Sequence, residues 1–197
     1  MPTPTRQYTK VARARGEEQT REALLDAAED AYLSDALDQV SLDALAAGAG
    51  STKQTLLRHF GSKDGLPRAA YERGIEHVRE QRFAAPVGDV AGAVDNLLDH
   101  YGELGDSALK IGAATSSALS AEIGKNARQL HYDWVDHAFS PWLETARGAE
   151  RRRLRGALIA LCDVQTWAIL SRDLGYPRAL LKATLVSAIE SLLRGSK

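Results

Sequence analysis

The stretch Ser41–Lys63 constrains this chain most, because it predicts two short helices joined by a tight turn. The first helix runs from Ser41 to about residue 47, and the Ser41 hydroxyl can accept hydrogen bonds from the unpaired amides of its first turn. Gly48 and Gly50 follow, and glycine tolerates the positive φ that a sharp exit from a helix needs. The apolar residues of this first helix share one face at helical spacing: Leu42, Leu45 and Ala46.

A second short helix is predicted to begin after Thr52, which offers another capping hydroxyl. Leu56 and Phe60 lie four residues apart and so share the face that packs inward. The outward face carries groups that bond phosphates and base edges: Lys53, Gln54, Thr55, Arg58 and His59. Two helices joined by a short turn with glycine form a helix-turn-helix, and a helix of this width fits the major groove of DNA.

The motifs of residues 17–70 together resemble the DNA-binding segment of the TetR family of bacterial regulators. They are ALLDAA at 23–28, AG at 49–50, TL at 55–56, HF at 59–60 and SK at 62–63. The sequence departs from the family at Ser51, where valine is usual, and at Gln54, where a small residue is common. Leu57 stands where the family usually has a tyrosine that touches phosphate. We therefore expect Leu57 to face the DNA but not to bond a phosphate.

The resemblance implies an all-α protein of about nine helices with a division of labour along the chain. We expect a flexible basic arm at 1–16, a three-helix DNA-binding head at 17–62, a connecting helix at 63–83 and an effector-binding and dimerisation domain at 87–197. Within the head, one group should address bases or nearby phosphates: Lys53, Gln54, Arg58 and His59. A second group should fix the register on phosphates: Ser41, Thr52, Thr55 and Lys63.

The distribution of charge supports contact with DNA, although the net charge of −1 does not. Residues 1–16 carry four basic side chains and no acid, whereas residues 17–50 carry one arginine against nine acids. Residues 51–68 carry four basic side chains against one acid. A local basic surface is sufficient for phosphate contact. The alternative is that these are ordinary solvated charges.

Composition favours a reduced, cytoplasmic setting. The chain has one cysteine, Cys162, so it cannot form an internal disulfide, and we expect Cys162 to be a small buried apolar residue. The sequence has no run of about 18 apolar residues, so we expect no membrane-spanning helix. The five histidines lack metal-binding spacing, so we expect neither a metal nor another cofactor.

Residues 87–197 predict a second, all-helical region. The expected helices cover 87–104, 107–120, 123–147 with a kink at Pro141, 150–173 and 178–193. His100 and Asn96 fall opposite the apolar stripe of their helix and are expected to face solvent. The last two helices are apolar on more than one side, which predicts a homodimer with a four-helix contact.

An effector pocket in this region can only be located by polar or aromatic groups on apolar faces. Gln165 lies in line with Leu154, Leu158 and Leu161, so it needs a partner. Four further candidates share this character: Tyr101, Ser116, Trp134 and His137. The alternative for each is an ordinary, satisfied core residue.

These observations predict a non-enzymatic, dimeric regulator of transcription that binds a pseudo-palindromic DNA operator. The resemblance implies a repressor that leaves DNA when a small molecule binds. One alternative is a helical enzyme or small-molecule carrier whose helix-turn-helix is only scaffold. Another is a regulator that answers to a protein partner. The sequence contains no nucleophile elbow or phosphate loop that would favour an enzyme.

Overall fold

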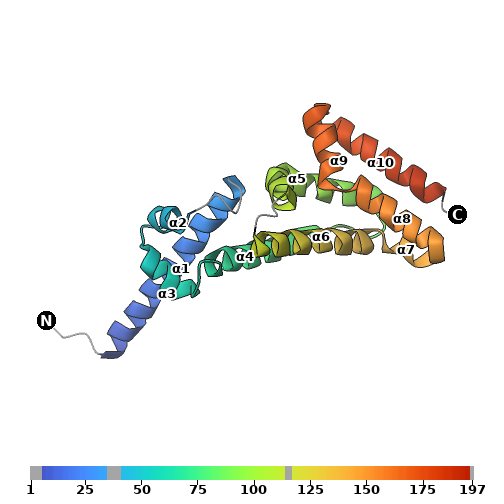
Figure 1. Ribbon diagram of the computed structural model, residues 1–197. Coiled ribbons are helices and arrows are strands. Elements are labelled where there is room, and N and C mark those ends of the chain that lie inside the picture. The colour runs from blue at the N-terminus through green and yellow to red at the C-terminus, as the bar shows by residue number, and fades with distance from the viewer. Residues whose placement is uncertain (1–5, 35–40, 114–116, 196–197) are drawn as a thin grey trace. The chain divides into compact units, whose positions relative to one another are not determined.

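The computed structural model describes residues 6–34, 41–113 and 117–195, and all the regular structure within these ranges is helical. The chain divides into two compact units, Met1–Gly74 and Ile75–Lys197. We call the first unit the head and the second the carboxy-terminal unit. The all-α class predicted from the sequence is confirmed (Figure 1).

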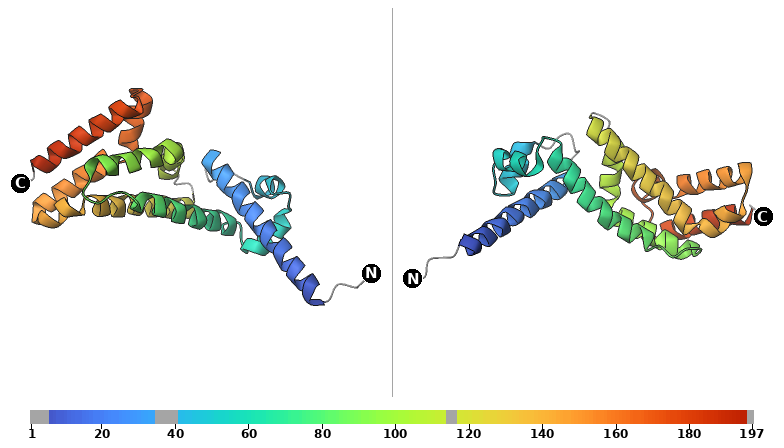
Figure 2. Two further views of the ribbon diagram at one scale, coloured as in Figure 1. Left: turned by 180° about the vertical axis from the view of Figure 1, so that it is seen from behind. Right: turned by 90° about the horizontal axis from the view of Figure 1, so that it is seen from below.

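The head is built from α1 (Arg6–Ser34), α2 (Leu42–Gly48), α3 (Lys53–Phe60) and the first half of α4 (Gly65–Phe83). The views in Figure 2 agree that α2 and α3 lie against one side of α1. Their contact buries a small apolar core: Leu24, Leu25, Ala28, Leu45, Ala46, Leu56, Leu66 and Ala70. This core positions α3 with one face inward and the other free.

The first helix begins at Arg6, whereas the sequence predicted a flexible arm over residues 1–16. The prediction is wrong for residues 6–16. The prolines of the arm stop at Pro4, and no proline or run of β-branched residues interrupts the segment that follows. The pair Arg13–Glu17, with Nε and Oε1 3.5 Å apart, adds support one turn apart. Residues 1–5 of the predicted arm lie outside the described residues.

Helix α4 belongs to both units, because the boundary between them falls after Gly74, in the middle of the helix. The sequence predicted one connecting helix over 63–83 between two domains. The two residues that precede α4, Lys63 and Asp64, are not helical. The helix is therefore a covalent link between the units.

The carboxy-terminal unit contains α5 (Val90–Ala113), α6 (Ala118–Ala138), α7 (Ser140–Thr145), α8 (Gly148–Leu161), α9 (Val164–Ala168), a π-helical turn (Ile169–Asp173) and α10 (Arg178–Arg194). Aromatic and aliphatic side chains from most of these helices form one core. Its largest fully buried members are Trp134, Phe139, Leu97, Leu143, Leu154, Leu158, Leu185 and Ile189.

The helices of this unit continue or break at other places than the sequence predicted. Helix α5 continues to Ala113, so no break separates residues 104 and 107. Helix α6 ends at Ala138, because the segment around Pro141 starts the short helix α7, where proline fits the first turn. The predicted helix 150–173 is interrupted after Leu161, because Asp163 caps a new helix by accepting a hydrogen bond from the backbone of Gln165 at 2.8 Å.

No single helix among the described residues is long and apolar enough to cross a membrane. Helix α8 and the segment Val164–Asp173 reach that length and hydropathy only as a pair, bent by 41°.

Candidate nucleic-acid interface

The turn between α2 and α3 is fixed by backbone hydrogen bonds. The Gly50 N–H donates to the Ala47 carbonyl at 3.0 Å, and the Ser51 N–H donates to the Ala46 carbonyl at 2.8 Å. This is the Schellman pattern of a helix end, and it needs a left-handed residue. Gly50 supplies it with φ of 60°. The glycine predicted to allow the turn is thus the residue that makes it.

Both short helices are capped by the hydroxyls that the sequence predicted. The Ser41 Oγ accepts from the Ala44 N–H at 3.1 Å, and the Thr52 Oγ1 accepts from the Thr55 N–H at 3.2 Å. Ser41 and Thr52 are exposed, and Thr55 is half-buried. A capping hydroxyl that accepts from the backbone keeps its own hydrogen, which a DNA phosphate can accept.

The outward face of α3 carries polar groups in the positions that the sequence predicted. Lys53, Gln54 and Arg58 are exposed, and Leu57 lies beside them with 36% of its surface exposed. Gln54, Thr55 and Arg58 line a shallow hollow of about 280 Å³. Leu56 is fully buried on the opposite face. Helix α3 therefore presents hydrogen-bonding groups outward while its apolar residues hold it to the head.

His59 differs from the other predicted base readers. It is half-buried, and its Nε2 atom is shielded from solvent without a hydrogen-bond partner among the described residues. The expectation that His59 points outward is wrong for this atom. Position 59 lies three residues after Leu56 and next to Phe60, so it borders the buried stripe.

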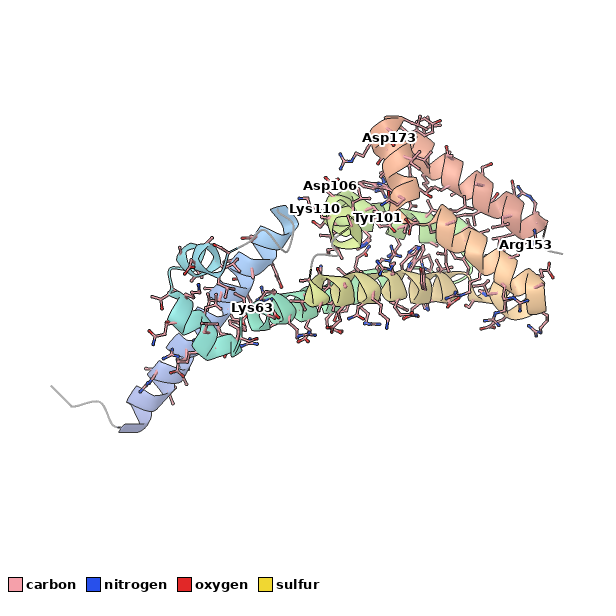
Figure 3. The ribbon with its side chains drawn as sticks, viewed as in Figure 1. Lys63, Tyr101, Asp106, Lys110, Arg153 and Asp173 are labelled. Carbon is pink, nitrogen blue, oxygen red and sulfur yellow. The ribbon has the colours of Figure 1, made fainter. Side chains whose placement is uncertain are left out.

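Two predicted phosphate contacts lie at the edges of α3. Lys53 Nζ is 3.0 Å from Asp43 Oδ2, and both side chains are largely exposed, so water and salt weaken this pair. Lys63 is exposed in the turn before α4 (Figure 3). Gly65 allows this turn to lie close to the end of α3, because any residue with a Cβ atom would place that atom 1.9 Å from the Phe60 carbonyl oxygen.

The acids of α1 are held by one cation on α4. Arg73 donates to Glu29 at 2.7 Å, to Asp26 at 2.7 Å and to Glu22 at 2.8 Å. The hydrogen bond to Glu29 is the largest of the effects that raise the pKa of Arg73, with Asp26 also contributing. The acidic stripe of the head is thus an internal brace between α1 and α4.

Comparison with known proteins agrees with this geometry. The model of the family described as "Bacterial regulatory proteins, tetR family" matches residues 24–70, which include α2, α3 and the adjoining parts of α1 and α4. The head is a TetR-family DNA-binding domain. No curated protein sequence matches the chain.

Two solved structures share the fold of most of the chain. One is a TetR-family transcriptional regulator from Streptomyces coelicolor, with a TM-score of 0.68 and 22% identity over 89% of this chain and 83% of that one. The other is a transcriptional regulator from Rhodococcus sp. Rha1, with a TM-score of 0.67 and 20% identity over 89% of this chain and 96% of that one. Outside the TetR-type head, the likeness is one of fold.

Of the four predicted effector residues that the structure describes, Tyr101 and Trp134 both lie against Arg82. Tyr101, labelled in Figure 3, is buried and donates to the Cys162 carbonyl at 3.0 Å. Trp134 is fully buried, and His137 is half-buried with its ring centroid 5.1 Å from that of Phe83. Gln165 is exposed. Ser116 lies outside the described residues.

The expectation that Gln165 shares a face with Leu158 is wrong, because the helix is interrupted between them. His100 and Asn96 were expected to face solvent, and this is also wrong. His100 is half-buried, and the Asn96 Nδ2 donates to the Gln81 carbonyl at 2.7 Å. The apolar pattern of one helix does not reveal that α4 covers this second side of α5.

The sequence reading missed Arg82, which is buried near Tyr101 and Trp134. One signal could have found it. Arg82 follows Val78 by four residues and so continues the inward stripe of α4. A charged residue on such a stripe calls for an explanation, because burying an unpaired charge is costly.

Proposed function

We propose that this protein is a homodimeric, sequence-specific DNA-binding regulator, a repressor that leaves its operator when a small molecule binds the carboxy-terminal unit. One observation carries the proposal. Helix α3 is capped at its start, anchored by the buried Leu56, and exposes Lys53, Gln54 and Arg58 on one face. Side chains of these types recognise phosphates and base edges in the major groove. Such a regulator acts on chromosomal DNA and so works in the cytoplasm.

The dimer is proposed to form through α8 and α10, which pack together in the carboxy-terminal unit (Figure 1). Helix α10 buries one stripe against its own subunit: Leu181, Leu185, Ile189 and Leu193. Leu180 remains 47% exposed on another side. On α8, Gly156 and Ala160 are exposed, and small residues allow close approach of a second helix. A twofold contact would cover these faces and place two heads on one pseudo-palindromic site.

The proposed release requires the effector to favour one spacing of the two heads. Half-sites on one face of DNA lie about 34–36 Å apart, so a shift of a few ångströms weakens simultaneous binding. A ligand can shift the equilibrium only by its difference in affinity for the two arrangements. Half of α4 lies in each unit, so a change at its carboxy-terminal end has a covalent route to the head.

Arg58→Ala tests the reading helix. DNA bound by the protein is first selected from a random pool, and affinity is then measured by gel shift at fixed salt. If Arg58 contacts a guanine, the variant should lose about 1–3 kcal/mol of binding free energy and some discrimination at one base position.

Arg151→Ala is the matched control. Arg151 is exposed in the basic run Arg151–Arg153 at the start of α8, within the carboxy-terminal unit. Its affinity for the selected DNA should equal that of the unaltered protein. Unchanged affinity of Arg58→Ala would remove Arg58 from the DNA-facing set, and weaker binding by Arg151→Ala alone would place the nucleic-acid surface on α8 instead.

A further inference from the structure

Arg82 is a buried cation inside the carboxy-terminal unit. Only 2% of its surface is exposed. Its guanidinium carbon lies 4.1 Å from the centroid of the Trp134 ring, and its Nη2 lies 3.2 Å from the Nδ1 of His131. Stacking on tryptophan favours a cation but does not neutralise it.

Arg82 has no carboxylate partner among the residues that the structure describes, and its Nη1 is buried without a hydrogen-bond acceptor there. The two titratable groups that act on the pKa of Arg82, Tyr101 and Cys162, do not supply a negative charge. Burial raises the pKa of the Cys162 thiol to about 12, and burial likewise raises the pKa of the Tyr101 hydroxyl. Both groups are therefore neutral at physiological pH. Asp163, which the structure also describes, affects the pKa values of Tyr101, Cys162 and His131 but forms no ion pair with Arg82.

The neighbouring histidines, His131 and His100, are neutral at physiological pH, so Arg82 is the cation that would attract an anion. Burial, followed by the charge of Arg82, lowers the pKa of His131 to about 4 and that of His100 to about 3. His131 accepts from Arg82 through Nδ1, so its Nε2 carries the hydrogen and donates to the Ile159 carbonyl at 3.1 Å. The ring is thus fixed in one neutral tautomer, which holds the guanidinium in place.

A second buried donor lies on the same stacked pair. The Trp134 Nε1–H is shielded from solvent and has no partner among the described residues. Both unsatisfied groups, Arg82 Nη1 and Trp134 Nε1, are donors only. A buried donor without an acceptor costs free energy, and two beside an unpaired cation call for an anion that offers several acceptor oxygens. The surrounding rings of Tyr101 and His100 are suited to an apolar body.

We propose that Arg82 is the anion-binding group of the effector site and that the effector is a carboxylic acid with an apolar or aromatic body. The carboxylate accepts from Arg82 Nη1, with Trp134 Nε1 as a second donor, and the aromatic rings contact the body. This inference rests on the proposed ligand-responsive function. It also gives the ligand a position on α4, whose first half belongs to the head.

Three acids serve as probes, each with its neutral amide: benzoate, indole-3-acetate and octanoate. Binding to the full chain is measured by calorimetry and by the rise in melting temperature. At least one acid should bind, its amide should bind at least tenfold more weakly, and Arg82→Met should lose the acid's affinity by at least tenfold. Trp134→Phe keeps the ring but removes the N–H, so it should weaken acid binding severalfold.

Arg172→Met is the matched control, because Arg172 also stacks on a tryptophan, with its guanidinium carbon 5.1 Å from the Trp167 ring, but it is exposed and paired with Asp106. It should bind the acids like the unaltered chain. Without ligand, Arg82→Met should melt at a higher temperature, because removing an unpaired buried charge relieves its desolvation. Equal affinity for acid and amide, unchanged binding by Arg82→Met, or no binding of any acid would overturn the proposal.

Gel shift separates this inference from the proposed function. Arg82→Met should bind selected DNA as tightly as the unaltered chain but should no longer release it when acid is added. Acid binding that depends on Arg82 in a chain without DNA affinity would leave the anion site intact and remove the regulatory function. DNA binding without an acid response that depends on Arg82 would support the DNA-binding function and remove the proposed anion site.

Discussion

Two arginines on the same helix show how differently the two units treat charge. Arg73, in the head, meets three carboxylates at 2.7–2.8 Å and is partly exposed. Arg82, nine residues later in the carboxy-terminal unit, is 2% exposed and meets no carboxylate among the described residues. The head therefore keeps an apolar core and places its charges in solvent or in ion pairs. The carboxy-terminal unit places a charge within its interior.

The contrast reflects different tasks. A surface that reads DNA needs exposed groups with freedom to meet phosphates and base edges, and only its support must be buried. A pocket that selects a small molecule gains from desolvated groups, since hydrogen bonds and charges are stronger away from water. The energy lost by leaving Arg82 unpaired is consistent with a site that is completed by a ligand.

The largest expected effect concerns the apolar core of the head. Leu56→Ala should destabilise the head by about 2–5 kcal/mol, because Leu56 is fully buried and alanine leaves a cavity. The adjacent Leu57→Ala is the control and should change stability by less than about 1 kcal/mol, since Leu57 is 36% exposed.

The measurement can separate the units, because all three tryptophans of the chain, Trp134, Trp142 and Trp167, lie in the carboxy-terminal unit. Urea unfolding is followed by far-ultraviolet circular dichroism, which reports both units, and by tryptophan fluorescence, which reports one. Leu56→Ala should lower the dichroism midpoint and leave the fluorescence midpoint in place. A shift of both midpoints together would show that the units unfold as one.

A smaller effect is expected from acid on the carboxy-terminal unit. The pKa of His131 falls from 6.5 to about 4, through burial first and the Arg82 charge second. The unfolded chain therefore binds more protons than the folded chain between these values. Keeping His131 neutral therefore adds nothing unfavourable to the free energy of unfolding above about pH 6.5. As the pH falls towards 4, the free energy of unfolding drops by about 1–3 kcal/mol because of this residue.

His131→Gln is the test, because glutamine offers an acceptor and a donor without titrating in this range. The fluorescence midpoint in urea should fall between pH 6.5 and 4 in the unaltered chain and should fall less in the variant. The acids of the protein titrate in both chains, so the difference between the two curves isolates His131. Parallel curves would show that His131 does not have the lowered pKa.

The smallest effect has the opposite sign to the one expected for Arg82→Met. Arg73→Met should destabilise the head by about 1–2 kcal/mol, because it leaves Glu22, Asp26 and Glu29 without their shared cation. The dichroism midpoint should fall, and the fall should shrink at high salt because the carboxylates are partly exposed. Stabilisation by Arg73→Met would mean that the two arginines of α4 are alike and would end the comparison.

The sequence determined most of the head. The caps Ser41 and Thr52 and the left-handed Gly50 act through backbone groups within six residues along the chain, so local spacing predicted them. The inward position of Leu56 followed from its helical spacing with Phe60, although the core that buries it comes from other helices. The helical class was predicted from helical periodicity together with the resemblance to the TetR family. His59 was harder, because a residue at the border of a stripe is covered or left free by its neighbours in space.

The tertiary structure decided the length of α1, the interruption after Leu161 and the whole environment of Arg82. The first two depend on local alternatives that differ little in free energy. Residues 6–16 can form an arm or extend α1, and the segment after Leu161 can continue the helix or start a new one capped by Asp163. The burial of Arg82 depends on Tyr101, His131 and Trp134, which come from α5 and α6. The periodicity of α4 places Arg82 on the inward stripe, but it does not predict which side chains of other helices surround the guanidinium.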